Sequence, residues 1–363
     1  MSFGTHGNSG SVCGNSASVG ALGAGHFGGG KVGSFSAWPF RKPVVPVPAK
    51  VAGTSQGKAV RIWRQGREYF ALSSALPPDC RWEKPDARSL KIHRGTAEMS
   101  FGQDGSCFLY NGCKIFLGFP FLREKQELYV SRADFESKIQ PLIHPQGIAA
   151  KIPVPRTLVL DAGHGGKDSG AVARGVSEKT WTWDVVQRLR QRLSSLGYRV
   201  ILTREGDPFV PLADRVAATK RAQPDLFLSL HFNACSNAGA RGFEIFTFPI
   251  PGAPATHAGG RQRGNASVSV TNHAFAAGNT IEAYALSSCL HDAFPHLENR
   301  GIKAERLQVL RNNPCPSVLV EGGFMTNAQD FEIFSKPENR ERLAGAIVEG
   351  IEKYRANVER IGH

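Results

Sequence analysis

Residues 156–166 read RTLVLDAGHGG, and this stretch decides the fold class of the chain. Residues 157–160 are β-formers with little alternation of apolar and polar side chains, which is typical of a strand buried on both faces. Glycines on both sides of His164 let the backbone turn tightly and leave room beside the imidazole for a ligand. Open α/β sheets carry their chemistry at this carboxyl edge, so His164 is a candidate metal ligand. A Gly-rich turn alone fits a phosphate cradle or a simple chain reversal equally well.

The segments after this turn alternate between helix and strand patterns. Ser177 is a candidate N-cap and Gly197 a candidate C′ residue for a helix with one apolar stripe. This alternation predicts an α/β fold with a mixed, mostly parallel sheet flanked by helices. His231 and Glu321 then come at strand ends, as His164 does, and can share one sheet edge. The expected strands are 157–160, 198–203, 225–230 and 317–320, and the expected helices are 177–196, 212–222, 279–294 and 338–355.

A smaller β-rich domain precedes the α/β part. Gln65-Gly66 and Asn111-Gly112 stand between apolar runs and predict hairpin turns, and Ser131 is placed to start a short helix after a strand. The predicted organisation is a Gly/Ser-rich disordered start with a basic Pro-containing linker at 1–57, the β-rich domain at 58–143, a linker at 144–155 and the catalytic α/β domain at 156–357.

Composition narrows the class of protein without deciding its function. The formal net charge of +13 favours polyanionic partners, namely nucleic acid, anionic lipid or a carboxylate-rich wall polymer. We find no nucleic-acid-binding motif and no apolar stretch of transmembrane length. The first basic residue is Lys31, and no apolar core of a signal peptide precedes it, so no signal peptide is recognisable.

The seven cysteines form no CxxC motif and no dense framework, which argues against a disulfide scaffold. Cys107 and Cys113 lie in the same predicted hairpin and could pair in an oxidising compartment. Unpaired buried thiols are the favoured interpretation.

Three scattered side chains are candidates for one metal site. His164, Glu178 and His231 offer two imidazoles and one carboxylate, which is the ligand set of a catalytic zinc ion with an open fourth position. Taken singly, Glu178 also fits a partner of its helix dipole, and His231 fits an ordinary loop histidine. Asp161 fits either a residue that orients a ligand histidine or a cap of the turn.

A family resemblance favours the metal interpretation. The segments VLDAGHGGKDSGA, SEK, TR, SLHFN and VEGGFMTN occur in this order, and over about residues 156–355 the chain resembles the zinc-dependent N-acetylmuramoyl-L-alanine amidases of the amidase 3 type. The resemblance implies hydrolysis of the amide that joins the lactyl group of N-acetylmuramic acid to L-alanine in peptidoglycan, with one Zn²⁺ per chain. It implies these site residues: zinc ligands His164, Glu178 and His231, catalytic carboxylate Glu321, and substrate-binding or packing residues Asn233 and Arg311.

The resemblance also sets expectations about partners and location. Peptidoglycan is the expected substrate, and action in the periplasmic or extracellular envelope follows from it. The Pro/Gly/Ser-rich segment 249–278 is a candidate lid that an activator protein would relieve. The β-rich domain resembles, more weakly, the copper-amine-oxidase-N-terminal-like module, which implies a binding or spacing role without copper. The alternatives are a zinc aminoacylase or carboxypeptidase, and a wall-binding protein with a retired site.

Overall fold

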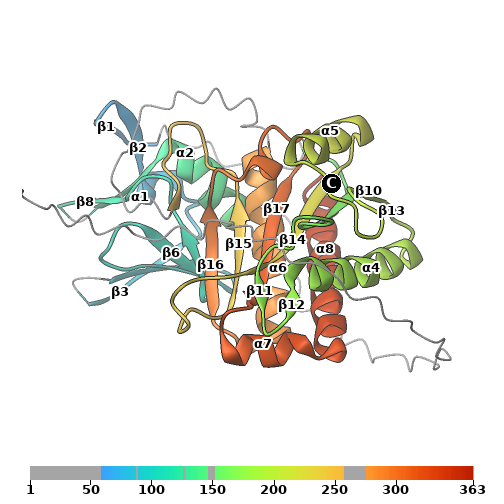
Figure 1. Cartoon of the computed structure of the whole chain (residues 1–363). Helices are drawn as coiled ribbons and strands as arrows, with labels where there is room; N and C mark the ends of the chain where they lie inside the picture. Colours follow the sequence, from blue (N-terminus) through green and yellow to red (C-terminus); the bar gives the residue numbers. More distant parts are fainter. Residues whose placement is uncertain (1–58, 87–88, 126, 146–151, 257–274, 363) are drawn as a thin grey trace, which may run out of the picture.

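The computed structural model describes residues 59–362 apart from 87–88, 126, 146–151 and 257–274 (Figure 1). The predicted disordered start and basic linker at 1–57 lie outside the described residues, as does half of the predicted linker at 144–155. None of the described helices is long and apolar enough to cross a membrane.

One sheet of eleven strands runs through the molecule, and it is mixed, as predicted (Figure 1). The first four strands in its order are mutually parallel, and the fifth runs antiparallel to the fourth. The order is β13 (Arg199–Leu202), β10 (Thr157–Ala162), β14 (Leu226–Asn233), β17 (Ser317–Phe324), β15 (Phe243–Thr247), β16 (Asn299–Ala304), β7 (Cys113–Phe116), β6 (Cys107–Tyr110), β5 (Ala97–Phe101), β4 (Ser89–Arg94) and β3 (Arg81–Asp86).

Helices cover the sheet on both faces, which explains the continuous apolar runs of the central strands. We call the face that carries Leu228 and Val320 the inner face; it packs against α4 (Glu178–Ser195), α6 (Ala276–Ala293) and α8 (Pro337–Gly362). The opposite, outer face carries Phe227 and Leu319, which pack with the end of α5 (Leu212–Ala222) and with the short helix η5 (Gln308–Leu310). In Figure 1 helices α6 and α8 lie behind β15 and β17, and α7 (Ala328–Ser335) lies below them.

The N-terminal part has a second sheet and several helical turns. The predicted hairpin turns are confirmed, since Gln65-Gly66 joins β1 to β2 and Asn111-Gly112 joins β6 to β7, with positive φ at all four residues. Ser131 accepts a hydrogen bond from the Asp134 N–H, as an N-cap does. The elements are β1 (Arg61–Arg64), β2 (Arg67–Ala71), β9 (Glu127–Ser131) and β8 (Leu122–Glu124) in that sheet, with α1 (Leu72–Ala75), α2 (Arg132–Asp134), the π-helical turn η1 (Phe135–Ile139) and α3 (Gln140–Ile143).

The large sheet crosses the predicted domain boundary. β7 of the N-terminal part pairs in parallel with β16 of the α/β part, with Ile115 opposite Ile302. At Gly301 (φ +89°) a Cβ would lie 2.5 Å from the Lys114 carbonyl oxygen, so this close contact of two strands requires glycine. The two parts are therefore joined by strand pairing as well as by the linker, and the division into two domains stays a prediction.

Several predicted element ends differ from the structure. β14 continues through His231 to Asn233 and β17 continues through Glu321 to Phe324, so these side chains lie within strands and not after them. Ser177 occupies the N-cap position of α4, but its side chain makes no capping bond. A small hairpin, β11 (Val172–Ala173) and β12 (Val176–Ser177), precedes the helix, and the Lys179 N–H, which a capping side chain could bind, donates to the Ser169 carbonyl instead.

The described cysteines are all free, which agrees with the favoured interpretation. Cys107 pairs across the hairpin with Phe116, and Cys113 pairs with Tyr110. Successive residues of a strand point to opposite faces, and Cys113 packs in the inner-face core. The two thiols therefore lie on opposite faces of the sheet.

Glu282 in α6 is fully buried, and neither of its carboxylate oxygens has a hydrogen-bond partner among the described residues. Burial raises the pKa of this carboxyl well above its ordinary value. The folded protein thus holds a proton on Glu282 at pH values where the unfolded chain releases it.

We expect the free energy of unfolding to fall as pH rises above the ordinary glutamate pKa, because only the unfolded state ionises Glu282 there, with a slope of at most about 1.4 kcal/mol per pH unit. Glu282→Gln removes this part of the pH dependence. Urea unfolding at about pH 5 and about pH 8 measures it, and Glu349→Gln, at an exposed residue, is the control. Parallel pH profiles for the parent protein and Glu282→Gln would contradict the assignment.

Candidate functional site

Three polar side chains meet at the carboxyl edge of the parallel strands. His164 lies in the turn after β10, Glu178 is the first residue of α4, and His231 lies near the end of β14. Each offers one ligand atom, and these atoms all lie within 4.8 Å of one another. Two imidazoles and a carboxylate at this separation are a donor set that suits a metal ion such as zinc.

The turn after β10 is shaped by the approach of the His231 ring. A Cβ on Gly163 would lie 2.4 Å from that ring, so glycine is required there. His164 itself has φ +62°, in the left-handed region that is uncommon for a residue with a side chain. The His164 and His231 rings lie edge to face, with centroids 4.8 Å apart. The strained turn is what brings the two imidazoles together.

Glu178 joins the two histidines. Its Oε1 lies 3.0 Å from His164 Nε2 and 2.9 Å from His231 Nδ1, and it accepts the Phe232 N–H at 3.0 Å. Its Oε2 accepts the Ala171 N–H at 2.9 Å. Burial opposes ionisation, but the hydrogen bonds and charges of the two histidines outweigh it and lower the pKa of this carboxyl. Glu178 is therefore a carboxylate, as a metal ligand must be.

Asp168 lies beside the cluster, and sequence reasoning did not identify it. Its Oδ2 is 3.0 Å from Nδ1 of His164, the ring nitrogen that faces away from Glu178. A carboxylate in this position fixes the orientation of a ligand imidazole. The signal was present in the quoted motif VLDAGHGGKDSGA, where Asp168 is the acidic residue that follows His164.

Asp161 supports the turn through Arg215 and does not contact a histidine. It is 1% exposed and bonds Arg215 Nη1 and Ser229 Oγ, each at 2.7 Å. Burial alone would raise the pKa of Asp161, but the Arg215 charge and these bonds lower it. Arg215 Nη2 in turn donates to the His164 carbonyl at 2.6 Å. Asp161 thus acts on the turn by holding the guanidinium that holds His164.

A second buried guanidinium completes this support. Arg204 Nε donates to the Ala162 carbonyl at 2.9 Å, and its Nη2 donates to the Gly163 carbonyl at 3.1 Å. Arg215 Nη1 also bonds the Ala162 carbonyl, at 2.7 Å. Carbonyl groups of a turn have no strand partner, and these two arginines satisfy them.

Glu321 lies next to the cluster on the neighbouring strand. It is directly opposite His231 in the parallel pairing of β14 and β17, so both side chains lie on the outer face. Its Oε2 is buried and has no hydrogen-bond partner among the described residues. Burial raises the pKa of Glu321 well above its ordinary value, and the charges of Glu178 and Glu244 add to this. The Glu321 carboxylate is therefore a stronger base than an ordinary glutamate side chain.

Asn233 is held by Glu244, which the sequence did not single out. Asn233 Nδ2 donates to Glu244 Oε1 at 2.7 Å, and Asn233 Oδ1 accepts the Ala234 N–H. Glu244 also bonds Arg300 and Lys303, which outweigh its burial and lower its pKa. Glu244 lies opposite Glu321 in the antiparallel pairing of β15 and β17, and it therefore adds a fixed negative charge beside it.

The structure does not bring Arg311 to the cluster. Arg311 is exposed and follows η5, before the first residue of β17. The described ends of the predicted lid lie on the same side: β15 ends at Thr247, and the Ala304 N–H at the end of β16 donates to Thr256 Oγ1. The middle of that segment, 257–274, lies outside the described residues.

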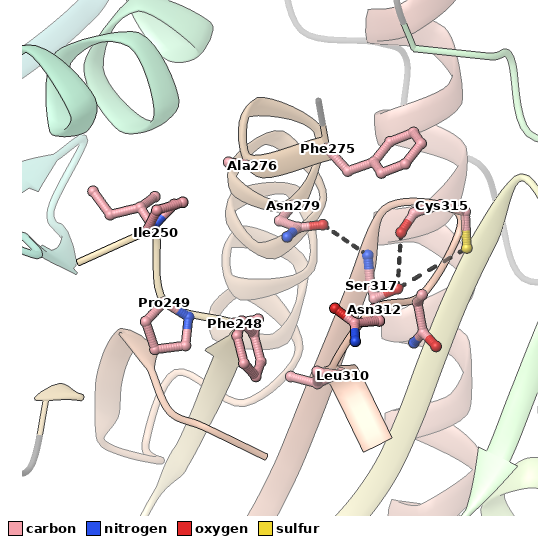
Figure 2. Close-up of a pocket in the computed structure, with 12 residues that line it drawn as sticks. Phe248, Pro249, Ile250, Phe275, Ala276, Asn279, Leu310, Asn312, Cys315 and Ser317 are labelled. Atoms are coloured by element: carbon pink, nitrogen blue, oxygen red, sulfur yellow. Dashed lines mark hydrogen bonds between the residues drawn. The ribbon is translucent and has the colours of Figure 1, made fainter. Parts of the chain in front are cut away.

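Figure 2 shows a small pocket near the start of β17, on the side of the sheet where Arg311 lies. Asn279 Oδ1 there accepts the N–H of Ser317, and Leu310 and Cys315 also line it. Its cavity of about 30 Å³ has room for little more than a water molecule. None of the candidate site residues lines it.

Comparison with known proteins identifies the family. The family model described as N-acetylmuramoyl-L-alanine amidase matches residues 158–353, more than half of the chain. This chain belongs to that amidase family. The match begins inside β10, so the N-terminal part lies outside it.

Relatives and solved structures match a similar share of this amidase. The uncharacterized protein YqiI of Bacillus subtilis is 33% identical over 199 residues, which are 55% of this chain and 84% of that protein. The amidase AmiA of Escherichia coli is 30% identical over 235 residues, 58% of this chain and 80% of that protein. The solved amidase AmiC2 of Nostoc punctiforme is 29% identical and has a TM-score of 0.46, covering 56% of this chain and 97% of that one.

We expect Arg215→Met to lower the free energy of unfolding of the amidase by about 3–5 kcal/mol, because it leaves the buried Asp161 charge without its partner. Lys336→Met removes an exposed partner of Glu332 and should cost at most about 1 kcal/mol. Chemical denaturation of both variants measures the difference. Equal losses of unfolding free energy in the two variants would show that the buried Arg215–Asp161 pair stabilises the protein no more than an exposed pair.

Proposed function

We propose that this chain is a zinc-dependent N-acetylmuramoyl-L-alanine amidase, which hydrolyses the amide between the lactyl group of N-acetylmuramic acid and the L-alanine of the stem peptide. The observation that carries the proposal is the meeting of His164, Glu178 and His231 beside Glu321 at one sheet edge, in a chain of this family. The relatives named amidases support the same activity.

The residues at the cluster fit one zinc ion as ligands. Glu178 is held as an anion by two backbone N–H groups, and both histidines present a ring nitrogen to the same point. Asp168 stands behind His164, as a carboxylate behind a ligand imidazole does. Zinc bound there supplies a Lewis acid that polarises the amide carbonyl and lowers the pKa of water to about 7.

Glu321 is proposed as the general base and acid. It lies beside His231, and its unpartnered Oε2 is free to accept a proton from an attacking water. Its raised pKa makes the carboxylate a stronger base, and the proton that it gains is available for transfer to the departing amine. Glu178 and Glu321 thus take different roles because their surroundings shift their pKa values in opposite directions.

Asn233 and Arg311 remain proposals for substrate contacts. Asn233 points to the same face as His231, and one of its two Nδ2 hydrogens is used by Glu244, which leaves the other for a substrate carbonyl. Arg311 lies away from the cluster, so it would contact a distant part of the polymer.

The proposed function also implies where the enzyme acts and how its activity could be regulated. Hydrolysis of peptidoglycan places the enzyme in the periplasmic or extracellular envelope. Relief of a lid at 249–278 by an activator protein remains a proposal, since most of that segment lies outside the described residues.

We expect incubation of the protein with muropeptides to release free stem peptides, and Glu321→Gln to slow this by about 10²–10⁴-fold because the proton acceptor is lost. Mass spectrometry of the products measures it. Cleavage of peptides that carry no sugar would favour an aminoacylase or carboxypeptidase. Muropeptides left intact by the zinc-loaded protein would contradict the amidase function.

We expect the purified protein to hold one zinc ion per chain, with His164→Ala and His231→Ala each losing it and Glu321→Gln retaining it. His296→Ala, at an exposed histidine outside the cluster, is the matched control. Elemental analysis after gel filtration gives the metal content. Full zinc content in both ligand variants would contradict the assignment of the zinc ligands.

A further inference from the structure

The outer face of the sheet continues beyond the candidate site into the N-terminal part. Over β14 and β17 it is packed by α5 and η5, but no described helix packs against it over β7, β6, β5 and β4. In Figure 1, β16 and β6 lie in the foreground and α6 lies behind. The face that carries Glu321 is therefore shared by strands that lie outside the family match.

Strand pairing places one row of side chains across this face. Residues that are directly opposite in a sheet point to the same face, so the row can be followed from strand to strand. It runs His231, Glu321 and Glu244, then through β16 at Arg300 and Gly301, and on through Lys114, Leu109, Ser100 and Lys91. Gly301 has no side chain, so nothing projects from the sheet at this position between Glu244 and Lys114.

Leu109 and Lys114, in the middle of this row, are exposed, and the half-buried Phe116 lies beside them on the same face; we call these three residues the Leu109 patch. Leu109 is 37% exposed, although it lies in the middle of a sheet. The amines of Lys114 and Lys303 lie 5.9 and 6.0 Å from the centre of the Phe116 ring. Lys114 makes no ion pair with any described residue.

The other lysines around the patch have carboxylate partners, and Lys114 does not among the described residues. Lys91 is 3.6 Å from Glu98, and Lys303 pairs with Glu244. One cation without an ion pair among the described residues, beside the exposed Leu109 and the half-buried Phe116, fits a ligand with both apolar and anionic groups. Sugar rings with carboxylate-bearing peptides have this chemistry, whereas a purely anionic polymer would leave the apolar side chains unused.

We propose that the Leu109 patch binds the peptidoglycan strand beyond the amide that is cleaved. This inference rests on the proposed function, because it takes the occupant of the patch to be the same polymer. Strands are spaced about 4.8 Å apart, so Leu109 lies about 19 Å along the sheet from Glu321. The two-residue peptide of a muramoyl dipeptide extends at most about 7 Å from the cleaved amide, which is well short of Leu109, so contacts at the patch need a longer stretch of the polymer.

The test compares two substrates in one double variant, Leu109→Asn with Lys114→Glu. We expect its rate on intact sacculi to fall about fivefold or more, since burial of one leucine and one charge contact are together worth a factor of this order. Its rate on N-acetylmuramoyl dipeptide should stay within about twofold. Leu196→Asn with Lys220→Glu makes the same chemical change at exposed positions, just after α4 and on α5, and should leave both rates unchanged.

A binding assay separates this inference from the proposed activity. In a Glu321→Gln background, the fraction of protein that pellets with sacculi should fall in the patch variant and not in the control variant, whether or not the parent cleaves. Equal binding, or an equal loss of rate on both substrates, overturns the proposal. A change of oligomeric state, or of protease access to residues 1–58, in the patch variant would assign the patch to a second copy or to the chain's own start, and also overturns it.

Discussion

The site depends on how the carbonyl groups of one turn are satisfied. The chain leaves β10 in a left-handed bend at His164, and side chains bind the carbonyl groups of Ala162, Gly163 and His164. The guanidinium groups of Arg204 and Arg215 bind all three. Since both groups are buried, the turn has few alternative conformations, and the His164 ring is held before any ligand arrives.

The same environment separates the carboxylates by charge state. Glu178 is anionic because two imidazoles and two backbone N–H groups surround it. Glu321, one strand away, has no such partners and faces two negative charges. Glu244 gains the cations of Arg300 and Lys303 and becomes a structural anion that orients Asn233. The partners around each carboxyl group, and not the residue type, decide which of the three can exchange a proton.

Much of this arrangement was predictable from the sequence, and the failures have physical reasons. Unbroken apolar runs showed the parallel strands, and positive-φ turn residues such as Asn111 and Gly112 showed the hairpins. Strand ends were predicted too early at His231 and Glu321, because polar residues at a functional edge resemble loop residues in a hydropathy pattern. The roles of Arg215 and Glu244 depend on partners far away along the chain, which local patterns do not reveal.

The parallel pairing of β7 with β16 has a consequence for how the molecule can be divided. An excised α/β part would leave one side of β16 with unpaired N–H and C=O groups, and such an edge invites association with other chains. The pairing also joins segments that are widely separated in sequence, which slows folding through the entropy of closing a long loop. The strands β7 to β3 therefore cover what would otherwise be an open edge of the sheet at β16.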